Sequence, residues 1–465
     1  MAGPLPLATN AFERYMLTDD RPRHPMTFGI RLTFSGRLDR AALESAVREA
    51  VSRHPLLAAH LVRKRWRRPT WVAAADPMPY VDISDESQPL RYPGTERIDL
   101  ESQTGLRIWA RSGPERTELR LQFHHSCTDG IGAYRFVEDL LCAYHRAVRP
   151  DDLDVDYRPL DGERLRHRTR CGLTWWQVLL RMPVEIWGVV VGLVMMLVLR
   201  PQPLLAAQSP GDDDEAAGPL LVDMPAHTFD AEQSDRLRQA ARAVGATMND
   251  LLLRDLLLAS QEWNARIDPT RRGRLLRVMM PMNLRGRGDE LLPACNVVAM
   301  VNVDRWLRWY PSAAGLLQTI RWETRLLRYF RFGLAFLRGV ALVELIPGGL
   351  QQLTRPGRCY ATTVLSNMGR AFAQCNLRRR GGKLLVGEMV LEGVESAPPV
   401  RSQTATGLTC LYYDGRLTVV QNYDPHHFAA ADAARLLELF VAQLHTSAAA
   451  GKALAHSQAA EVPAR

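Results

Sequence analysis

Lysine is nearly absent from this chain of 465 residues. Only Lys64, Lys383 and Lys452 are lysines among 59 basic residues, and the net charge is +9. The arginines cluster in short runs at expected strand ends and loops, such as residues 63–68 and 378–380. Because no nucleic-acid recognition module accompanies these runs, we expect no nucleic-acid partner. The arginine bias itself indicates a GC-rich bacterial genome.

Paired cysteines and an export signal are also missing. The seven cysteines are scattered without a C-x-x-C pair, and the N-terminus has no basic region followed by an apolar stretch. These absences favour a reducing compartment. We expect a cytoplasmic protein and leave open a peripheral position at the inner face of the membrane.

Two further absences exclude classes of chemistry. No His/Cys cluster has metal-ligand spacing, which argues against a metal site. No G-x-S-x-G elbow is present, which argues against a Ser-His-Asp hydrolase. Apolar residues at 46% and charged residues at 23% are typical of a globular protein with room for two or three domains. The alanine-rich tail after Thr446 is expected to be disordered.

The chain does have an H-H-x-x-x-D-G heptapeptide at residues 124–130. With 12 histidines in the chain, these four fixed positions arise by chance about once in a thousand such chains. Apolar and polar residues alternate over 117–123, which predicts a half-buried strand. Apolar residues then recur at helical spacing over 137–144. The motif is therefore expected on a strand-to-helix turn, with His125 pointing inward and His124 outward.

The residue types of the heptapeptide suit proton transfer. A neutral imidazole can accept a proton from a hydroxyl or an amine, so His125 is a candidate base. Asp129 can cap the following helix or pair with a distant cation, and Gly130 can give the turn backbone freedom. Two alternatives stay open: His125 as a hydrogen-bonded core residue, and Asp129 as a helix cap alone. Cys127 occupies a variable position and is expected to fill space rather than act as a nucleophile.

H-H-x-x-x-D-G resembles the active-site motif of the coenzyme A-dependent acyltransferase superfamily. This superfamily includes chloramphenicol acetyltransferase, condensation domains of nonribosomal peptide synthetases, alcohol acetyltransferases, and bacterial wax ester synthase/diacylglycerol acyltransferases. The resemblance implies an α/β protein with two chloramphenicol-acetyltransferase-like lobes and a tunnel between them. It implies that His125 is the catalytic base, that Asp129 is structural, and that acyl transfer is direct. His124 and Gly130 would support the site.

Other segments are similar to superfamily segments in the same order. Near the N-terminus, an alternating strand at 28–34 precedes a G-x-L-D segment, a helix capped by Asp39, and R-H-P-L-L at 53–57. Residues 247–250 resemble a T-x-N-D segment that opens an apolar helix. An alternating hairpin over 408–422 and a helix over 430–444 follow near the C-terminus.

Two of the ordered segments bear on the site. Residues 281–285 follow a predicted strand and resemble a P-x-N-x-R stretch whose arginine pairs with the motif aspartate in relatives. This implies an ion pair between Asp129 and Arg285. Residues 366–369 resemble the S-N-x-G turn near the tunnel, which makes Ser366 and Asn367 candidates for the oxyanion site or the tunnel wall.

The stretch 172–207 is unusually apolar, with Arg181, Glu185 and Arg200 as its only charges. Its uncharged core is shorter than the roughly 20 residues of an untilted membrane span. A single crossing would also separate the two lobes and divide the site. We therefore predict a helix that lies in the membrane interface or re-enters it, and the nearby arginines at 164, 166, 168 and 170 support this. A buried helix between the lobes is the alternative.

The sequence thus predicts an acyltransferase with a motif-bearing N-terminal lobe at 1–165, an apolar insert at 166–215 and a C-terminal lobe at 216–465. An acyl thioester would donate its acyl group to a hydroxyl or amine acceptor, and the apolar segments favour a lipidic substrate. Acyl-CoA is the favoured co-substrate, an acyl carrier protein is a further possible donor, and no cofactor is expected. The alternative is a catalytically silent condensation-like protein that binds lipid or attaches to a membrane.

Overall fold

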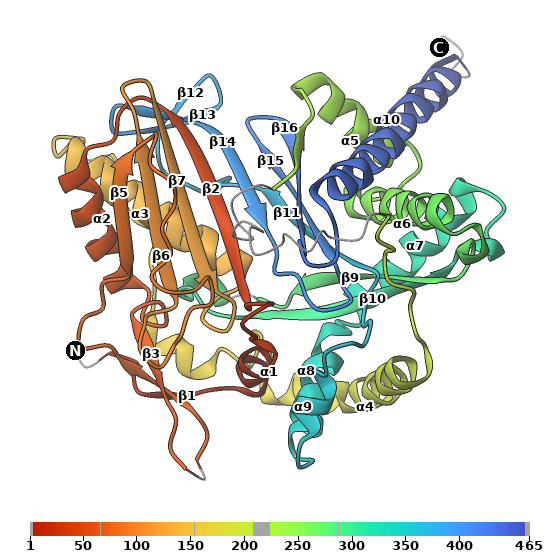
Figure 1. The fold of residues 1–465 in the computed structure, drawn as a ribbon, viewed down its shortest axis with the longest axis horizontal. Helices are drawn as coiled ribbons and strands as arrows, with labels where there is room; N and C mark the ends of the chain where they lie inside the picture. Colours follow the sequence, from red (N-terminus) through yellow and green to blue (C-terminus); the bar gives the residue numbers. More distant parts are fainter. Residues whose placement is uncertain (1–2, 66, 153, 208–223, 287, 461–465) are drawn as a thin grey trace.

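The computed structural model describes residues 3–65, 67–152, 154–207, 224–286 and 288–460. Two β-sheets lie next to each other, and helices cover each of them (Figure 1). Each sheet forms a buried apolar core of its own with its helices. This arrangement confirms the prediction of an α/β protein with two sheet-rich lobes.

The first sheet has seven strands in the order β12-β13-β14-β2-β7-β6-β5. The strands are β2 (Thr27–Ser35), β5 (Tyr80–Asp85), β6 (Leu106–Ser112), β7 (Arg116–His124), β12 (Arg379–Arg380), β13 (Lys383–Val386) and β14 (Met389–Ala397). Helices α2 (Arg40–Arg53) and α3 (Gly130–Val148) pack on this sheet (Figure 1). The predicted alternation is present in β7, and Asp39 caps α2 by accepting a hydrogen bond from Ala42 N.

The second sheet has six strands in the order β10-β9-β11-β15-β16-β8. The strands are β8 (Ala226–Thr228), β9 (Leu275–Asn283), β10 (Val298–Trp306), β11 (Thr363–Arg370), β15 (Thr406–Tyr413) and β16 (Arg416–Tyr423). Its helices are α5 (Ala231–Ala243), α6 (Met248–Ile267), α7 (Ala313–Tyr329) and α10 (Ala430–Ala460). The hairpin of β15 and β16 confirms the predicted one. The prediction of a disordered tail after Thr446 is wrong as far as Ala460, because α10 continues to that residue through alanine-rich sequence of high helix propensity. The last part of the tail, 461–465, lies outside the described residues.

The remaining elements lie at one end of the molecule or at its edges. A small sheet has the strand order β1-β4-β3. These elements are β1 (Leu7–Ala8), β3 (Ala59–Val62), β4 (Thr70–Ala73), α1 (Ala11–Asp19), α4 (Trp175–Val198), α8 (Gly333–Glu344) and α9 (Gly349–Leu353). In Figure 1, α1, α4, α8 and α9 lie in the lower part of the view.

The predicted division into lobes needs a correction. Strands β12 to β14 fall within the predicted C-terminal lobe, yet they belong to the first sheet, where β14 pairs antiparallel with β2. A sequence pattern indicates that a segment is a strand but not which distant strand it pairs with, so the crossover was not visible. The predicted boundary at 215/216 lies outside the described residues.

Candidate active site

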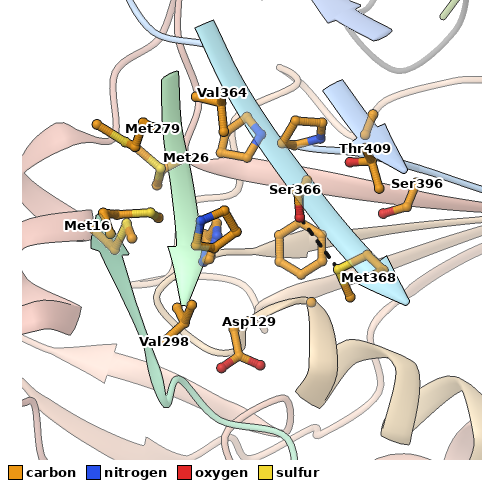
Figure 2. Close-up of a pocket in the computed structure, with 18 of the residues that line it drawn as sticks. Met16, Met26, Asp129, Met279, Val298, Val364, Ser366, Met368, Ser396 and Thr409 are labelled. Carbon is orange, nitrogen blue, oxygen red and sulfur yellow. Dashed lines mark hydrogen bonds between the residues drawn. The ribbon is translucent and has the colours of Figure 1, made fainter. Parts of the chain in front are cut away.

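A pocket of about 160 Å³ lies between the two large sheets. Its lining comes from both lobes: His125 and Phe28 belong to the first lobe, and Ser366 and Thr409 lie on strands of the second sheet. Figure 2 shows Val364, Ser366 and Met368 along β11, with Asp129 below this strand in the view. The heptapeptide therefore meets the second sheet at this point, and the pocket occupies the predicted position of the interlobe tunnel.

His125 is held in the pocket through its main chain. Its N–H donates to the Met26 carbonyl at 2.7 Å, and the Asn296 amide donates to its carbonyl. The Phe28 ring lies 5.0 Å from the imidazole, centroid to centroid. Burial lowers the pKa of His125, and hydrogen bonding to its own main chain and the charge of Asp129 offset part of this effect. The imidazole is therefore neutral near pH 7 and able to accept a proton.

His124 is not among the residues that line the pocket, and it is fully buried rather than on the predicted outer face. Its Nδ1 accepts a hydrogen bond from Ser126 N at 3.2 Å and contacts Ser126 Oγ at 2.8 Å, and its Nε2 lies 3.5 Å from Asp20 Oδ2. Asp20 also accepts a hydrogen bond from Met26 N at 2.9 Å. His124 therefore contacts the group that fixes Met26, whose carbonyl in turn holds His125.

Asp129 is both a helix cap and one half of an ion pair. Its Oδ1 accepts from Gly132 N at 2.8 Å and from Arg285 Nη2 at 3.0 Å, and its Oδ2 accepts from Arg285 Nη1 at 2.8 Å and Val297 N at 2.8 Å. Burial raises the pKa of the Asp129 carboxyl group, whereas Arg285 and the two amides lower it. The lowering effects together are larger than the effect of burial, so the pKa of Asp129 lies below its usual value. Arg285 also donates to the Cys295 carbonyl at 2.9 Å. The pair thus joins the heptapeptide to the loop after β9.

Gly130 has a different role from the one expected of it. It is the first residue of α3 and is not among the glycines with positive φ, so the turn does not need its backbone freedom. What it supplies is space, since a Cβ there would lie 2.8 Å from Met368 Cε in the pocket. Gly132 is more restricted, because a Cβ would lie 2.3 Å from Thr128 Oγ1 and 3.0 Å from Cys295 N.

Ser366 and Asn367, the oxyanion or tunnel candidates, both line the pocket. Ser366 Oγ lies 3.5 Å from Met368 Sδ, a weak partner that leaves the hydroxyl available (Figure 2). Asn367 Oδ1 accepts from Gly369 N at 3.1 Å, so this side chain also shapes the turn. Their role toward a substrate stays a prediction.

The sequence did not indicate several other pocket residues. Ser396 on β14 and Thr409 on β15 bring two more hydroxyl groups. Five methionines also line the pocket: Met16, Met26, Met279, Met300 and Met368. Methionine is flexible and polarisable, so such walls adapt to an irregular apolar ligand. No local motif marks these positions, because they become neighbours only through strand pairing.

Metal and thiol chemistry find little support in the described ranges. Within them, no three His, Cys, Asp or Glu side chains gather where they could hold a metal ion. Cys127 is fully buried, and burial raises the pKa of its thiol. A thiolate, the nucleophilic form, is therefore disfavoured there, in keeping with a space-filling role.

The comparisons with known proteins support the fold. No model of a known protein family matches the sequence. An uncharacterized protein from Mycobacterium tuberculosis (strain H37Rv) is 28% identical over 287 residues, which cover 60% of this chain and 62% of that protein. The match therefore spans less than two thirds of the relative. A nonribosomal peptide synthetase from Metarhizium robertsii is 32% identical over 118 residues, 25% of this chain and 1% of that protein.

Solved structures cover nearly the whole chain. The first condensation domain of the CDA synthetase matches with a TM-score of 0.67 and 18% identity, over 96% of this chain and 97% of that one. The starter condensation domain of rhizomide synthetase in complex with C8-CoA matches with a TM-score of 0.64 and 12% identity, over 96% of this chain and 95% of that one. Polyketide synthase associated protein 5 from Mycobacterium tuberculosis matches with a TM-score of 0.59 and 16% identity, over 96% of this chain and 98% of that one.

These likenesses establish that the chain has the fold of condensation domains, which is the broader part of the predicted resemblance. The narrower link to wax ester synthases stays a prediction. At identities below 20%, the fold alone carries over, so the activity must be argued from the site.

Proposed function

We propose that this protein is an acyltransferase that moves an acyl group from a thioester to a hydroxyl or amine acceptor, with His125 as the general base. One observation carries the proposal: a buried, neutral His125 lies in a pocket between two condensation-type lobes, on a loop fixed by the Asp129–Arg285 pair. A histidine with only a packing role would not require an open pocket between the lobes.

The proposed reaction needs no acyl-enzyme. The acceptor O–H or N–H gives its proton to His125 while its lone pair attacks the thioester carbonyl carbon. The resulting oxyanion would accept a hydrogen bond from Ser366, or from the Asn367 amide. When the carbonyl re-forms, the C–S bond breaks and the leaving thiolate takes the proton from His125. Asp129 touches no substrate in this scheme; it positions the loop.

Two observations support the choice of substrates. A neighbour of the same fold has been solved in complex with C8-CoA, which supports an acyl-CoA donor, and carrier-bound donors are supported by the synthetase neighbours. The five methionines of the pocket favour an apolar acyl chain. Acyl-CoA would act as a co-substrate rather than a resident cofactor.

A thiol-release assay tests the proposal. Purified protein is incubated with a series of acyl-CoA thioesters and pooled alcohols and amines, and free thiol and acylated products are measured. We expect His125→Ala to lower the rate by about 10²–10⁴-fold. His60→Ala, a half-buried histidine on β3 outside the pocket, is the matched control and should leave it unchanged. Equal rates in His125→Ala and the wild type would refute the proposal and favour a catalytically silent lipid-binding protein.

A further inference from the structure

An exposed apolar surface lies on α4 and α8. Of the 19 large apolar residues that are exposed in the described ranges, 14 lie on α4 or on and just after α8. Near the start of α4, Trp175, Trp176 and Leu180 are 63%, 60% and 79% exposed. Leu345, which directly follows α8, is 72% exposed. Water-soluble monomers rarely expose a contiguous apolar patch of this extent without a partner. We call these exposed faces the apolar helix pair.

The apolar helix pair is attached firmly to the protein. Gly188 of α4 packs so closely on α8 that a Cβ there would lie 2.8 Å from Ala335 Cβ. Glu185 and Val189 are the only buried residues of α4 whose burial the structure describes. The alternative of a buried interlobe helix is therefore wrong, because α4 lies on the surface and turns most of its apolar side chains outward.

The charges around the apolar helix pair suit an anionic lipid surface. The only acids on α4 and α8, Glu185 and Glu344, pair with Arg338 and Arg14. Arg170 and Arg200 are exposed before and after α4. One predicted contributor is excluded, since Arg168 is buried in an ion pair with Glu13. An apolar face bordered by exposed arginines matches the acyl and headgroup layers of an anionic membrane.

A second cavity opens onto this surface. It has a volume of about 830 Å³, within the range of ligand pockets. Four exposed residues line it: Met182 and Ile186 of α4, Leu342 of α8, and Leu345 just after α8. The same cavity reaches Val298 at the start of β10, and Val298 also lines the pocket of His125. The two spaces therefore share one wall.

That wall is a small apolar cluster made by α1, α8 and β10. Phe12 of α1 lines the second cavity, whereas Met16, one turn later, lines the pocket of His125. Phe336 of α8 packs edge-on against Phe12, with ring centroids 5.8 Å apart. Residues of α1, α8 and β10 thus separate the second cavity from the pocket of the proposed base.

We propose that the apolar helix pair docks on the surface of an anionic lipid bilayer, and that the second cavity receives an acyl chain from that bilayer. Residues Trp175–Met196 are long and apolar enough to cross a membrane by length and composition alone. Both ends of α4 are tied to β9, however, because Gly172 packs on Gly286 just after it and Gln202 N donates to Leu275 O at its start. The helix therefore lies along the membrane surface. The docking proposal does not depend on the proposed function, whereas delivery of the acyl chain toward His125 rests on it.

Vesicle flotation tests the docking. Vesicles of phosphatidylcholine, with and without phosphatidylglycerol, are mixed with the full chain and floated on a density gradient. We expect Trp175→Glu/Trp176→Glu to lower the bound fraction by more than about tenfold, since two large apolar contacts are replaced by charge. The matched control is Trp309→Glu/Trp322→Glu, whose tryptophans are 60% and 66% exposed outside the helix pair.

The outcomes separate lipid from other occupants. Wild-type binding that strengthens with phosphatidylglycerol, is unchanged in the control and is lost in the Trp175/Trp176 variant supports docking. Equal binding of the two variants overturns it. A wild type that stays off both vesicles and forms a dimer by light scattering, dissociated by Trp175→Glu/Trp176→Glu, also overturns it and assigns the surface to a second copy.

A fluorescent acyl probe tests the cavity without using activity. Dansyl undecanoic acid should bind the wild type with enhanced emission, and Ala341→Trp, which places a large ring in the cavity, should weaken binding by about tenfold. Val244→Trp, at an exposed position outside the cavity, is the control. Unchanged affinity in Ala341→Trp refutes the cavity assignment. Because neither experiment measures turnover, each result is distinct from a failure of the proposed function.

Discussion

Arg285→Met tests how the heptapeptide loop is held. Arg285 and Asp129 are buried, with side chains 6% and 4% exposed, and form two hydrogen bonds of 2.8 and 3.0 Å. Methionine preserves the volume but leaves a buried carboxylate with only the Gly132 and Val297 amides. Breaking a buried pair in this way costs about 3–5 kcal/mol of stability. Urea unfolding followed by circular dichroism measures the loss.

A second buried pair in the protein separates stability from positioning. Arg277 on β9 donates to both oxygens of Asp304 at 2.6 Å, with exposures of 2% and 15%, and neither residue lines the pocket. Arg277→Met should destabilise the protein by a similar amount. After correction for the folded fraction, only Arg285→Met should lower kcat/KM in the thiol-release assay, because only that pair fixes the loop of His125.

The loss in Arg285→Met should also depend on pH. In the wild type the pKa of Asp129 lies below its usual value, so its contribution to stability is present above about pH 4 and is lost as pH falls through the folded-state pKa. Without the arginine, burial raises the pKa of Asp129, and the variant can fold with this carboxyl group protonated. The stability difference between wild type and variant should therefore shrink as pH falls from about 7 to 5. A difference that is constant with pH, or an Arg285→Met protein with wild-type stability and kcat/KM, would refute the reasoning.

Three further predictions follow from the site. Because burial lowers the pKa of His125, kcat/KM should stay constant down to about pH 6.5 and fall only in more acid solution, as a pH–rate profile would show. A profile that falls with a midpoint above that of free imidazole would contradict this. Gly132→Ala should cost about 1–3 kcal/mol in urea unfolding because its Cβ meets neighbouring atoms at 2.3 and 3.0 Å, whereas Gly130→Ala should cost less, since it meets only the flexible end of a methionine. Equal costs would show that space is not what these glycines supply. Ser366→Ala should lower kcat about 100-fold with little change in KM, and Ser396→Ala in the same pocket should not; identical effects would remove Ser366 from the oxyanion site.

Much of the fold was predictable because it is encoded locally. The alternation over 117–123, the Asp39 cap and the hairpin of 408–422 depend on neighbouring residues, and each is present in the structure. The superfamily resemblance implied the pairing of Asp129 with Arg285, two positions that are 156 residues apart, and the structure contains that ion pair. The local pattern offered Asp129 two roles, a helix cap or a partner of a distant cation, but it did not name Arg285 as that cation.

The rest depends on contacts that a linear pattern does not encode. Alternation placed His124 opposite His125, but it gave no sign that Asp20 and Ser126 would bury it. The pairing of β14 with β2, which crosses the predicted boundary between lobes, is a contact between residues more than 300 positions apart. The methionine lining of the pocket arises in the same way, from strands and helices that meet only in the folded chain.

The crossover of β14 has a mechanical consequence. This strand is hydrogen-bonded into the first sheet, and within ten residues the chain enters the second sheet as β15. The chain also passes from the second sheet to the first between β11 and β12, over residues 371–378. Two short connections, 371–378 and 398–405, therefore limit how far the lobes can separate, and the second of them lies next to Ser396 and Thr409 of the pocket. Because Ser396 and Thr409 lie within a few residues of the 398–405 connection, we expect the spacing of these two hydroxyl groups to change little if the lobes move apart.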